Sequence, residues 1–273
     1  MQKIIITLGF MICTMFVYSQ QHCATIAEQA FYKIYNDVFD NINFLASHWQ
    51  NNVTNEKDIT KRMKDLDILA NKIAEKLRLG KIPLKYLRDK DGNIVGYLKD
   101  ENGDTFINAG RYTPSSKQIS VNKTYLKEVS TEEMVNVIAH EVYHAYQANE
   151  VIRLQNNEYR DEYLKLLNQY NTAENDVMRA SARDRIKKFE EKQEIIKEWE
   201  RNFQSSVIKE LEEYYQTITN NPNLANNPVL IRLQTKEKRK ALEAQYNDMY
   251  VEKHANEFAE TMTKVYKDKY NIK

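Results

Sequence analysis

The sequence predicts an α+β protein that is mainly helical, with a small antiparallel meander packed on one helix and a long helical insertion. Two observations lead to this prediction. All six Gly lie at or before Gly110, and neither Gly nor Pro occurs in residues 115–221, a composition typical of long helices. Short β-branched and aromatic runs, separated by turns rich in Asp, Asn and Gly, lie within residues 84–122 and indicate the meander.

The first 20 residues are predicted to be a signal peptide for export. Lys3 supplies the positive charge at the start, and residues 4–17 form an uncharged, mostly apolar run that ends near the small residue Ser19. This run is too short for a comfortable transmembrane helix. We therefore expect a periplasmic or secreted protein with no stable membrane anchor once the signal is cleaved.

The composition restricts the partners and the means of stabilisation. The chain carries 40 basic and 39 acidic residues, so it lacks the basic excess of nucleic-acid-binding proteins, and we expect no nucleic acid as a partner. Cys23 is the single cysteine beyond the predicted signal. An internal disulfide is therefore excluded, and stability must come from packing or from a metal ion.

Residues 21–83 are predicted to form two amphipathic helices, over residues 24–50 and 57–79. Gly80 directly follows the second pattern, and Pro83 comes shortly after it. Glycine just past a helix and proline a few residues later are the usual signals of a helix end. We therefore expect Gly80 to be the C-cap of the second helix.

Residues 84–149 are predicted to hold the meander and then one helix, over residues 131–149. The strand-like runs are residues 86–87, 94–98, 105–107 and 118–122. Ser130 and Glu133 have the spacing of a capping box, in which each side chain binds the main chain of the other. The sequence therefore predicts that this helix has a well-defined start immediately after the sheet.

Residues 150–234 are predicted to be a helical, coiled-coil-like insertion, because apolar residues recur there at spacings of three and four. The first predicted seam is Tyr163, Leu166, Tyr170, Ala173, Val177 and Ala180. The second is Ile196, Trp199, Phe203, Val207, Leu211, Tyr214 and Ile218. Residues 235–273 then form a last helix, in one or two pieces. The insertion is a candidate surface for a protein partner or for self-association.

The predicted helix at 131–149 contains the H-E-x-x-H pattern of zinc metallopeptidases, His140-Glu141-Val142-Tyr143-His144. Residues four apart on a helix differ by about 40° and one turn, so both imidazoles can reach one ion. Glu141 stands about 100° from His140, beside the ion. Zinc lowers the pKa of a bound water to about 7, and Glu141 is positioned to take the proton as a general base.

A catalytic zinc site needs a third protein ligand. No third His follows at metzincin spacing, so the third ligand is expected to be a carboxylate on another helix. Glu252 is the best candidate, because Ala255 and Ala259 on its helical face would let the helix approach closely. The alternatives that stay open are Glu257, Glu260 and Glu150.

Four further residues are candidates for supporting the site. Asn256, one turn after Glu252, could accept a hydrogen bond from the outer nitrogen of a zinc-bound His. Gln147 lies on the His140 face and could line the site. Tyr112 and Tyr143 could donate to a developing oxyanion. His254 points away from the ion and is expected to be a surface or packed residue.

The two motifs together resemble a known group of enzymes. H-E-x-x-H followed by E-x-x-A-N-x-F-A (residues 252–259) resembles the gluzincin branch of the zincins and is most similar to small bacterial ImmA/IrrE-like zincins. The resemblance implies one Zn²⁺ per chain, with Glu252 as the third ligand. Residues 110–112 and 119–122 also resemble the edge strand of such peptidases. The 107 residues that separate the motifs (145–251), and the predicted export, depart from this family.

The sequence therefore predicts an exported zinc metallopeptidase that hydrolyses a peptide or protein substrate through a zinc-bound water, with Glu141 as general base. The substrate is expected to pair with the strand at residues 118–122 by β-addition. The alternative is an extracytoplasmic binding protein, in which the helical insertion docks a partner and the zinc site is structural or vestigial. A secreted toxin with the same zinc chemistry is a third hypothesis.

Overall fold

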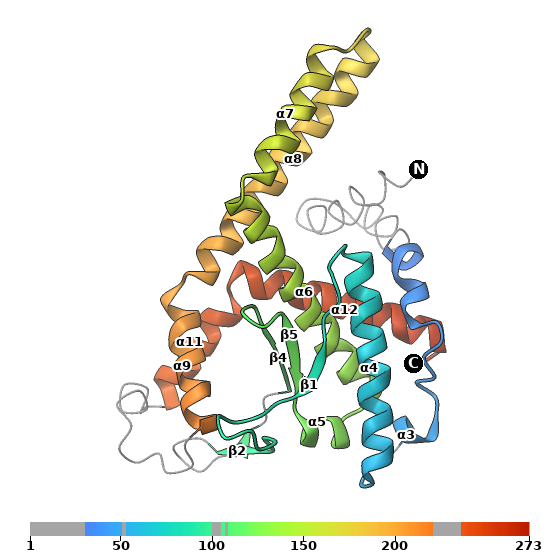
Figure 1. Cartoon of the computed structure of the whole chain (residues 1–273), viewed down its shortest axis with the longest axis vertical. Helices are drawn as coiled ribbons and strands as arrows, with labels where there is room; N and C mark the ends of the chain where they lie inside the picture. The colour runs from blue at the N-terminus through green and yellow to red at the C-terminus, as the bar shows by residue number, and fades with distance from the viewer. Residues whose placement is uncertain (1–30, 51–52, 100–104, 107–108, 221–235, 273) are drawn as a thin grey trace.

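The computed structural model describes residues 31–50, 53–99, 105–106, 109–220 and 236–272, and the structural statements below concern these residues. The protein is mainly helical with one three-stranded sheet, so the predicted α+β class is confirmed (Figure 1). The predicted signal peptide lies outside the described residues. Within them, no helix is both long and apolar enough to cross a membrane.

The elements follow one another in a simple order, which Figure 1 shows from blue to red. The helices are η1 (Asn36–Phe39), α3 (Ser47–Gln50), α4 (Glu56–Lys76), α5 (Lys123–Glu128), α6 (Thr131–Gln155), α7 (Glu158–Asn171), α8 (Asp176–Phe203), α9 (Ser206–Asn220), α11 (Lys236–Asn247) and α12 (Tyr250–Tyr270). The strands are β1 (Leu84–Tyr86), β2 (Leu98–Lys99), β3 (Thr105–Phe106), β4 (Gly110–Thr113) and β5 (Gln118–Val121).

The helix predicted over residues 24–50 is wrong in its described part, where the chain bends between η1 and α3. The bend passes through Asn41, which has a φ of 62°. Its physical reason is a buried aromatic cluster, in which the ring centroids of Phe39 and Phe44 lie 6.3 Å apart and those of Phe44 and Trp49 lie 5.3 Å apart. Residues five apart on a straight helix point about 140° away from each other, so a continuous helix could not bring these rings together.

Helix α4 ends earlier than the sequence predicts, and Gly80 is not its C-cap. Arg78 adopts a left-handed conformation with a φ of 60°, and the Leu79 N–H donates to the Ala74 carbonyl at 2.8 Å. This closure is a Schellman motif, which is usually made with glycine. Since the chain has already turned at Arg78, Gly80 lies in the connection that leads to β1.

The main sheet is mixed, whereas the sequence predicted an antiparallel meander. β5 is the central strand, with β1 parallel to it on one side and β4 antiparallel on the other, while β2 and β3 pair separately. β5 takes the centre because Ile119 and Val121 supply its apolar face, and both are completely buried. The expected pairing of a substrate with residues 118–122 is therefore wrong, because both sides of β5 are occupied. β4 is an edge strand of this sheet.

Helix α6 is the centre of the body, and α4, α8 and α12 pack against it (Figure 1). The predicted capping box at its start is confirmed. The Glu133 N–H donates to the Ser130 side chain at 3.2 Å, and the Ser130 N–H donates to the Glu133 carboxylate at 3.0 Å. The helix ends at Gln155, six residues beyond the predicted end at Asn149.

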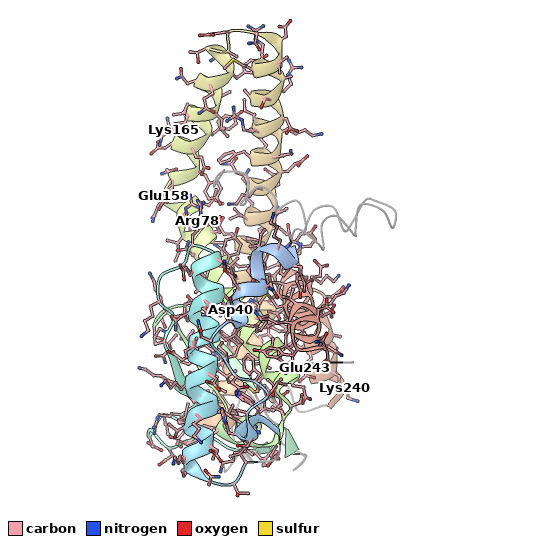
Figure 2. The ribbon with its side chains drawn as sticks, turned by 90° about the vertical axis from the view of Figure 1, so that its right-hand side faces the viewer. Asp40, Arg78, Glu158, Lys165, Lys240 and Glu243 are labelled. Carbon is pink, nitrogen blue, oxygen red and sulfur yellow. The ribbon has the colours of Figure 1, made fainter. Side chains whose placement is uncertain are left out.

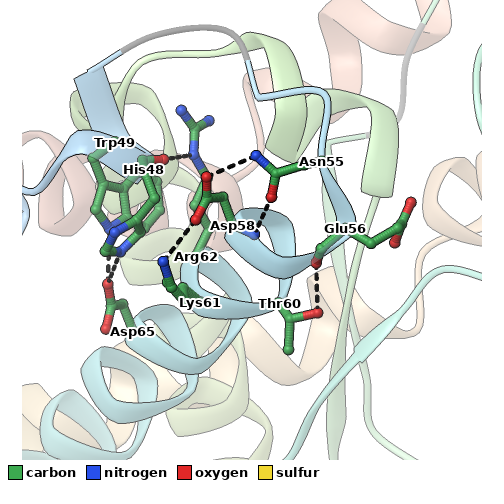
Figure 3. A network of polar contacts seen from close by, with 9 residues as sticks. All are labelled: His48, Trp49, Asn55, Glu56, Asp58, Thr60, Lys61, Arg62 and Asp65. Atoms are coloured by element: carbon green, nitrogen blue, oxygen red, sulfur yellow. Dashed lines mark hydrogen bonds and ion pairs between the residues drawn. The ribbon is translucent and has the colours of Figure 1, made fainter.

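A polar network holds α3 against α4 (Figure 3), and Arg62 extends it to the end of α5. The ring nitrogens of His48 and Trp49 each lie 2.9 Å from one carboxylate oxygen of Asp65. The buried Arg62 guanidinium donates to the main-chain carbonyl of His48 and, at 2.7 Å, to that of Leu126. Backbone carbonyls at the end of α5 thus gain a cationic partner, which is favourable at a helix C-terminus.

Helices α7 and α8 form an antiparallel pair that rises from the body (Figure 1), and Figure 2 shows the pair from the side, with Glu158 near its base. The rings of Tyr159 and Phe189 pack between the helices, with centroids 5.5 Å apart. Val177, predicted in the first seam, is 80% exposed. That part of the seam, including Ala180, is wrong because α7 ends at Asn171 and the chain reverses there.

Candidate metal centre

Helix α6 presents His140 and His144 one turn apart on the face that α12 covers. Their Nε2 atoms lie 2.9 Å from each other, and both rings are partly buried. Two imidazoles whose Nε2 atoms aim at a common point are the geometry that the i, i+4 spacing predicts for a shared ion. Close packing of α6 against α12 limits the other positions that these rings can adopt.

Glu252, in the first turn of α12, completes the cluster. One carboxylate oxygen lies 3.1 Å from His144 Nε2 and the other lies 3.3 Å from His140 Nε2. The carboxylate is almost completely buried, and Ala255 and Ala259, both fully buried, line the interface that brings α12 this close. Within the described part of the chain, no other set of three His, Cys, Asp or Glu side chains is arranged to hold a metal ion.

The donor set and its spacing fit a zinc ion. Tetrahedral zinc takes nitrogen and carboxylate ligands at 2.0–2.1 Å, which places the ligand atoms roughly 3.3 Å from one another. The separations from Glu252 to the two Nε2 atoms, 3.1 and 3.3 Å, are close to this value. Two histidines and one glutamate are also the ligand set of open catalytic sites, where a fourth position remains for water or substrate.

The charges of the cluster also favour a cation. Burial acts to raise the pKa of the Glu252 carboxyl, but the neighbouring His144 and His140 hold that pKa well below its usual range. Burial acts to lower the pKa of His144, but the Glu252 carboxylate outweighs it and raises that pKa to about 9. The buried carboxylate thus requires a positive partner, which is a proton on His144 or a metal ion in its place.

Glu141 lies beside the cluster and is held by the edge strand. Its Oε2 accepts a hydrogen bond from the Tyr112 main-chain N–H at 2.6 Å, and the side chain is buried. This contact requires β4 to pass very near α6. A Cβ on Gly110 would lie 2.8 Å from Val137 Cγ1, so glycine is the residue that permits this approach. Glu141 therefore stands where the sequence predicted a general base.

Gln147 connects the two predicted metal-binding motifs. Its Nε2 donates to the Val251 carbonyl at 2.8 Å, which turns Oε1 toward His144 Nδ1 at 2.9 Å. Nδ1 of His144 therefore carries the proton that it donates to Gln147, and Nε2 faces the cluster. An outer hydrogen bond of this kind fixes the orientation of a metal-binding imidazole. Asn256, predicted for this role, is exposed, and Gln147 takes the place assigned to it.

Comparison with known proteins agrees with this geometry at the level of the family. Residues 102–184 match the SprT-like family. This is a zincin-like, zinc-associated family related to metallopeptidases. The matched segment contains the edge strand and both histidines but ends well before Glu252. The finer resemblance to ImmA/IrrE-like zincins gained no support. No curated protein and no solved structure matches the chain.

The two tyrosines predicted as oxyanion donors occupy different positions. Tyr143 is buried in the core, where its ring stacks on Phe258 with centroids 4.8 Å apart. Tyr112 is half-buried, and its main-chain N–H is the group that reaches Glu141. His254 is packed, as expected, and accepts a hydrogen bond from Trp199 Nε1 at 3.1 Å; burial lowers its pKa to about 4.

The alternative third ligands lie away from the cluster. Glu257 and Glu260 are on the exposed face of α12. Glu150 is buried at the base of α7, where its carboxylate binds Arg153 at 2.8 Å and Lys192 at 2.6 Å. Of the four candidate glutamates, Glu252 alone is placed beside both histidines.

Proposed function

We propose that the protein is an exported zinc metallopeptidase whose metal ligands are His140, His144 and Glu252. The observation that carries the proposal is the convergence of these three side chains from two helices, with Glu141 buried beside them. The match to a zincin-like family over the segment that contains both histidines supports the same chemistry.

We assign the general-base role to Glu141 and the proton transfer to its Oε1 atom. A zinc ion bound by the three ligands would polarise the substrate carbonyl and acidify water. Because the Tyr112 N–H occupies Oε2, that hydrogen bond fixes the carboxylate while Oε1 takes the proton of the attacking water and returns it to the leaving amine. Gln147 keeps the His144 ring in the orientation that this arrangement needs.

We propose that the substrate is an extended peptide that pairs with β4. The Tyr112 N–H points to Glu141 and away from β5, so Tyr112 is a position at which the main chain of β4 faces outward. Because the Tyr112 N–H is already bonded to Glu141, a peptide that adds to this edge would pair at that position with the Tyr112 carbonyl, which faces the same way. Such a peptide would pass beside Glu141 and the proposed metal ligands. Arg111, on the same strand, is paired with Glu212 of α9 at 3.1 Å, so α9 borders this edge.

The test is to replace Glu141 by Gln, with hydrolysis of an unfolded protein substrate followed by mass spectrometry. Glu141→Gln is expected to retain about one zinc per chain and to lose at least about a hundredfold in rate, because the base is gone while the ligands remain. His140→Ala is expected to lose the zinc. Glu132→Gln, a change at a half-buried residue in the first turn of the same helix, is the control and should retain both zinc and activity. Full activity of Glu141→Gln would contradict the mechanism.

Export is part of the proposal and rests on residues 1–20 of the sequence. The test is to recover the protein from outside the cytoplasm of an expressing cell and to measure its mass, which shows whether the first residues have been removed. A chain that begins after Ser19 or Gln20 is expected, and a full-length chain retained in the cytoplasm would contradict it.

The second candidate function is binding of a protein partner through the outer part of the α7–α8 pair. The projection of the two helices beyond the body favours it (Figures 1 and 2). So do Val177 and Met178, which are 80% and 50% exposed where the pair reverses. Such a surface is compatible with peptidase activity, because the outer end of the α7–α8 pair projects beyond the body that contains α6 and α12 (Figure 1).

A further inference from the structure

Val251, the residue before Glu252, is held by side-chain amides from two other helices. Gln147 Nε2 of α6 donates to the Val251 carbonyl at 2.8 Å. On the other side, the Val251 N–H donates to Oδ1 of Asn202, in the last turn of α8, at 3.1 Å. Val251 is completely buried. Its carbonyl also takes part in the hydrogen bonding of α12, but its N–H lies in the first turn and has no partner within the helix. Losing Asn202 would therefore leave this N–H without ready access to water.

Helix α12 depends on this external partner because its own cap is weak. Its N-cap residue is Met249, which has no side chain able to accept a hydrogen bond from the first turn. The N–H groups of a first helical turn have no partner within the helix. Asn202 supplies an acceptor to one of them from a different helix, and thereby fixes where α12 begins relative to α8.

These contacts form a continuous path from a metal ligand to α8. His144 Nδ1 donates to Gln147, Gln147 donates to Val251, and Val251 donates to Asn202. One turn further along α12, Trp199 of α8 donates to His254 at 3.1 Å. The last two turns of α8 therefore contact the first two turns of α12 at two separate points, one on each side of Glu252 in the sequence.

We propose that Asn202 is a positioning residue of the metal centre, which acts by fixing the first turn of α12 and hence the Glu252 carboxylate. The inference rests on the proposed function, since it takes Glu252 to be a ligand. If Asn202 has this role, the helical insertion consists of two functionally different parts. The last turns of α8 belong to the metal centre, whereas the outer part of the α7–α8 pair does not.

The experiment measures zinc affinity of the full chain by competition with a chromophoric chelator. Asn202→Ala is expected to weaken zinc binding about tenfold or more, the usual effect of losing a residue that orients a ligand. Glu198→Ala is the matched control, because it removes the other partner of Asn202, Nδ2 to Glu198 Oε1 at 3.3 Å, and leaves the Val251 contact intact. It should change the affinity by less than about twofold.

A second measurement separates positioning from a general loss of folding. In a Glu252→Ala background, Asn202→Ala is expected to change zinc affinity by less than about twofold, because the ligand on which it acts is absent. Equal losses in both backgrounds, or no loss in the parent, would overturn the inference. If Asn202→Ala does not fold, Asn202→Asp is made in the Glu198→Ala background, so that two carboxylates do not face each other. This variant retains an acceptor for the Val251 N–H and should stay within about threefold of the Glu198→Ala protein. A tenfold loss with Asn202→Asp would likewise overturn it. A parent chain that binds no zinc would refute the proposed function itself.

Discussion

Gly110 sets the distance between the edge strand and the helix that carries the histidines. A methyl group at this position would lie 2.8 Å from Val137 Cγ1, and a valine in a helix has essentially one side-chain rotamer available. The strand would therefore have to move, and the Tyr112 N–H would move away from Glu141 with it. At the scale of single residues, the position of Glu141, the proposed general base, thus depends on the absence of a side chain at residue 110, two residues before Tyr112.

Replacing Gly110 by Ala is expected to lower peptide hydrolysis about tenfold while zinc affinity changes by less than about twofold, since no ligand is touched. Overpacking of this kind also costs about 1–3 kcal/mol in the free energy of unfolding. Adding Val137→Ala should restore most of the activity, because it removes the atom that the new methyl group meets. Gly80→Ala, where a Cβ would meet nothing within 4 Å, is the control. A single Gly110→Ala variant with parental activity would contradict the role of this contact.

At the scale of secondary-structure elements, the buried carboxylate of Glu150 joins α6 to α8 at the base of the α7–α8 pair. Burial acts to raise the pKa of Glu150, but Lys192 and Arg153 outweigh it and hold that pKa below its usual value of 4.5. Lys192 belongs to α8 and Arg153 to the end of α6, so one carboxylate connects the two helices. A folded-state pKa below the unfolded one stabilises the protein above the unfolded pKa, and this stabilisation is lost as the pH falls through the folded pKa.

The stability difference between the parent and Glu150→Gln should therefore depend on pH. In chelated protein at pH 7, the substitution is expected to lower the free energy of unfolding by about 3 kcal/mol, because two cations lose a buried partner. Below pH 4.5 the difference should shrink, as the parent carboxylate becomes protonated. Denaturant unfolding at several pH values measures it. Glu162→Gln, which removes an exposed contact to Arg153 at 3.5 Å, is the control and should have little effect at any pH. A difference that does not vary with pH would show that the charge of Glu150 is unimportant.

The sequence predicts contacts between residues that are close together along the chain. It predicts contacts between distant residues only where a residue pattern indicates them. The capping box at Ser130 and the histidine spacing depend on residues within one or two turns, and both appear as predicted. Glu252 was found through the small residues of its helical face. Asn202 carries no such signal, because its partner is a main-chain N–H 49 residues away along the chain. The parallel pairing of β1 with β5 is equally invisible in short strand patterns.

At the scale of the whole molecule, the outer α7–α8 pair is expected to be separable from the metal centre. The ion pair between Glu150 and Lys192 lies toward the base of the pair, as do the hydrogen bonds of Trp199 and Asn202 to α12. A chain in which residues 167–186 are replaced by a short turn should keep about one zinc and hydrolyse a small peptide within about twofold of the parent rate. Loss of zinc in this variant would contradict the separation.

The same shortened chain tests the second candidate function. If the outer pair binds a protein partner, the variant should lose that binding, or lose activity on a folded protein substrate, while its activity on a small peptide persists. Co-purification with the full chain and with the shortened chain, under the same conditions, measures the difference. If both chains recover the same partners in equal amounts, the outer part of the α7–α8 pair is not the binding surface.

The separation of the proposed metal ligands along the chain has a consequence for biosynthesis. Glu252 follows His144 by 108 residues, and a ribosome adds about 5–20 residues per second. The two histidines are therefore made about 5–20 s before the carboxylate that lies beside both of them in the folded protein. Asn202 also emerges during this interval. A nascent chain thus has an incomplete candidate metal centre throughout that period, and the three side chains can converge only after the later helices have docked.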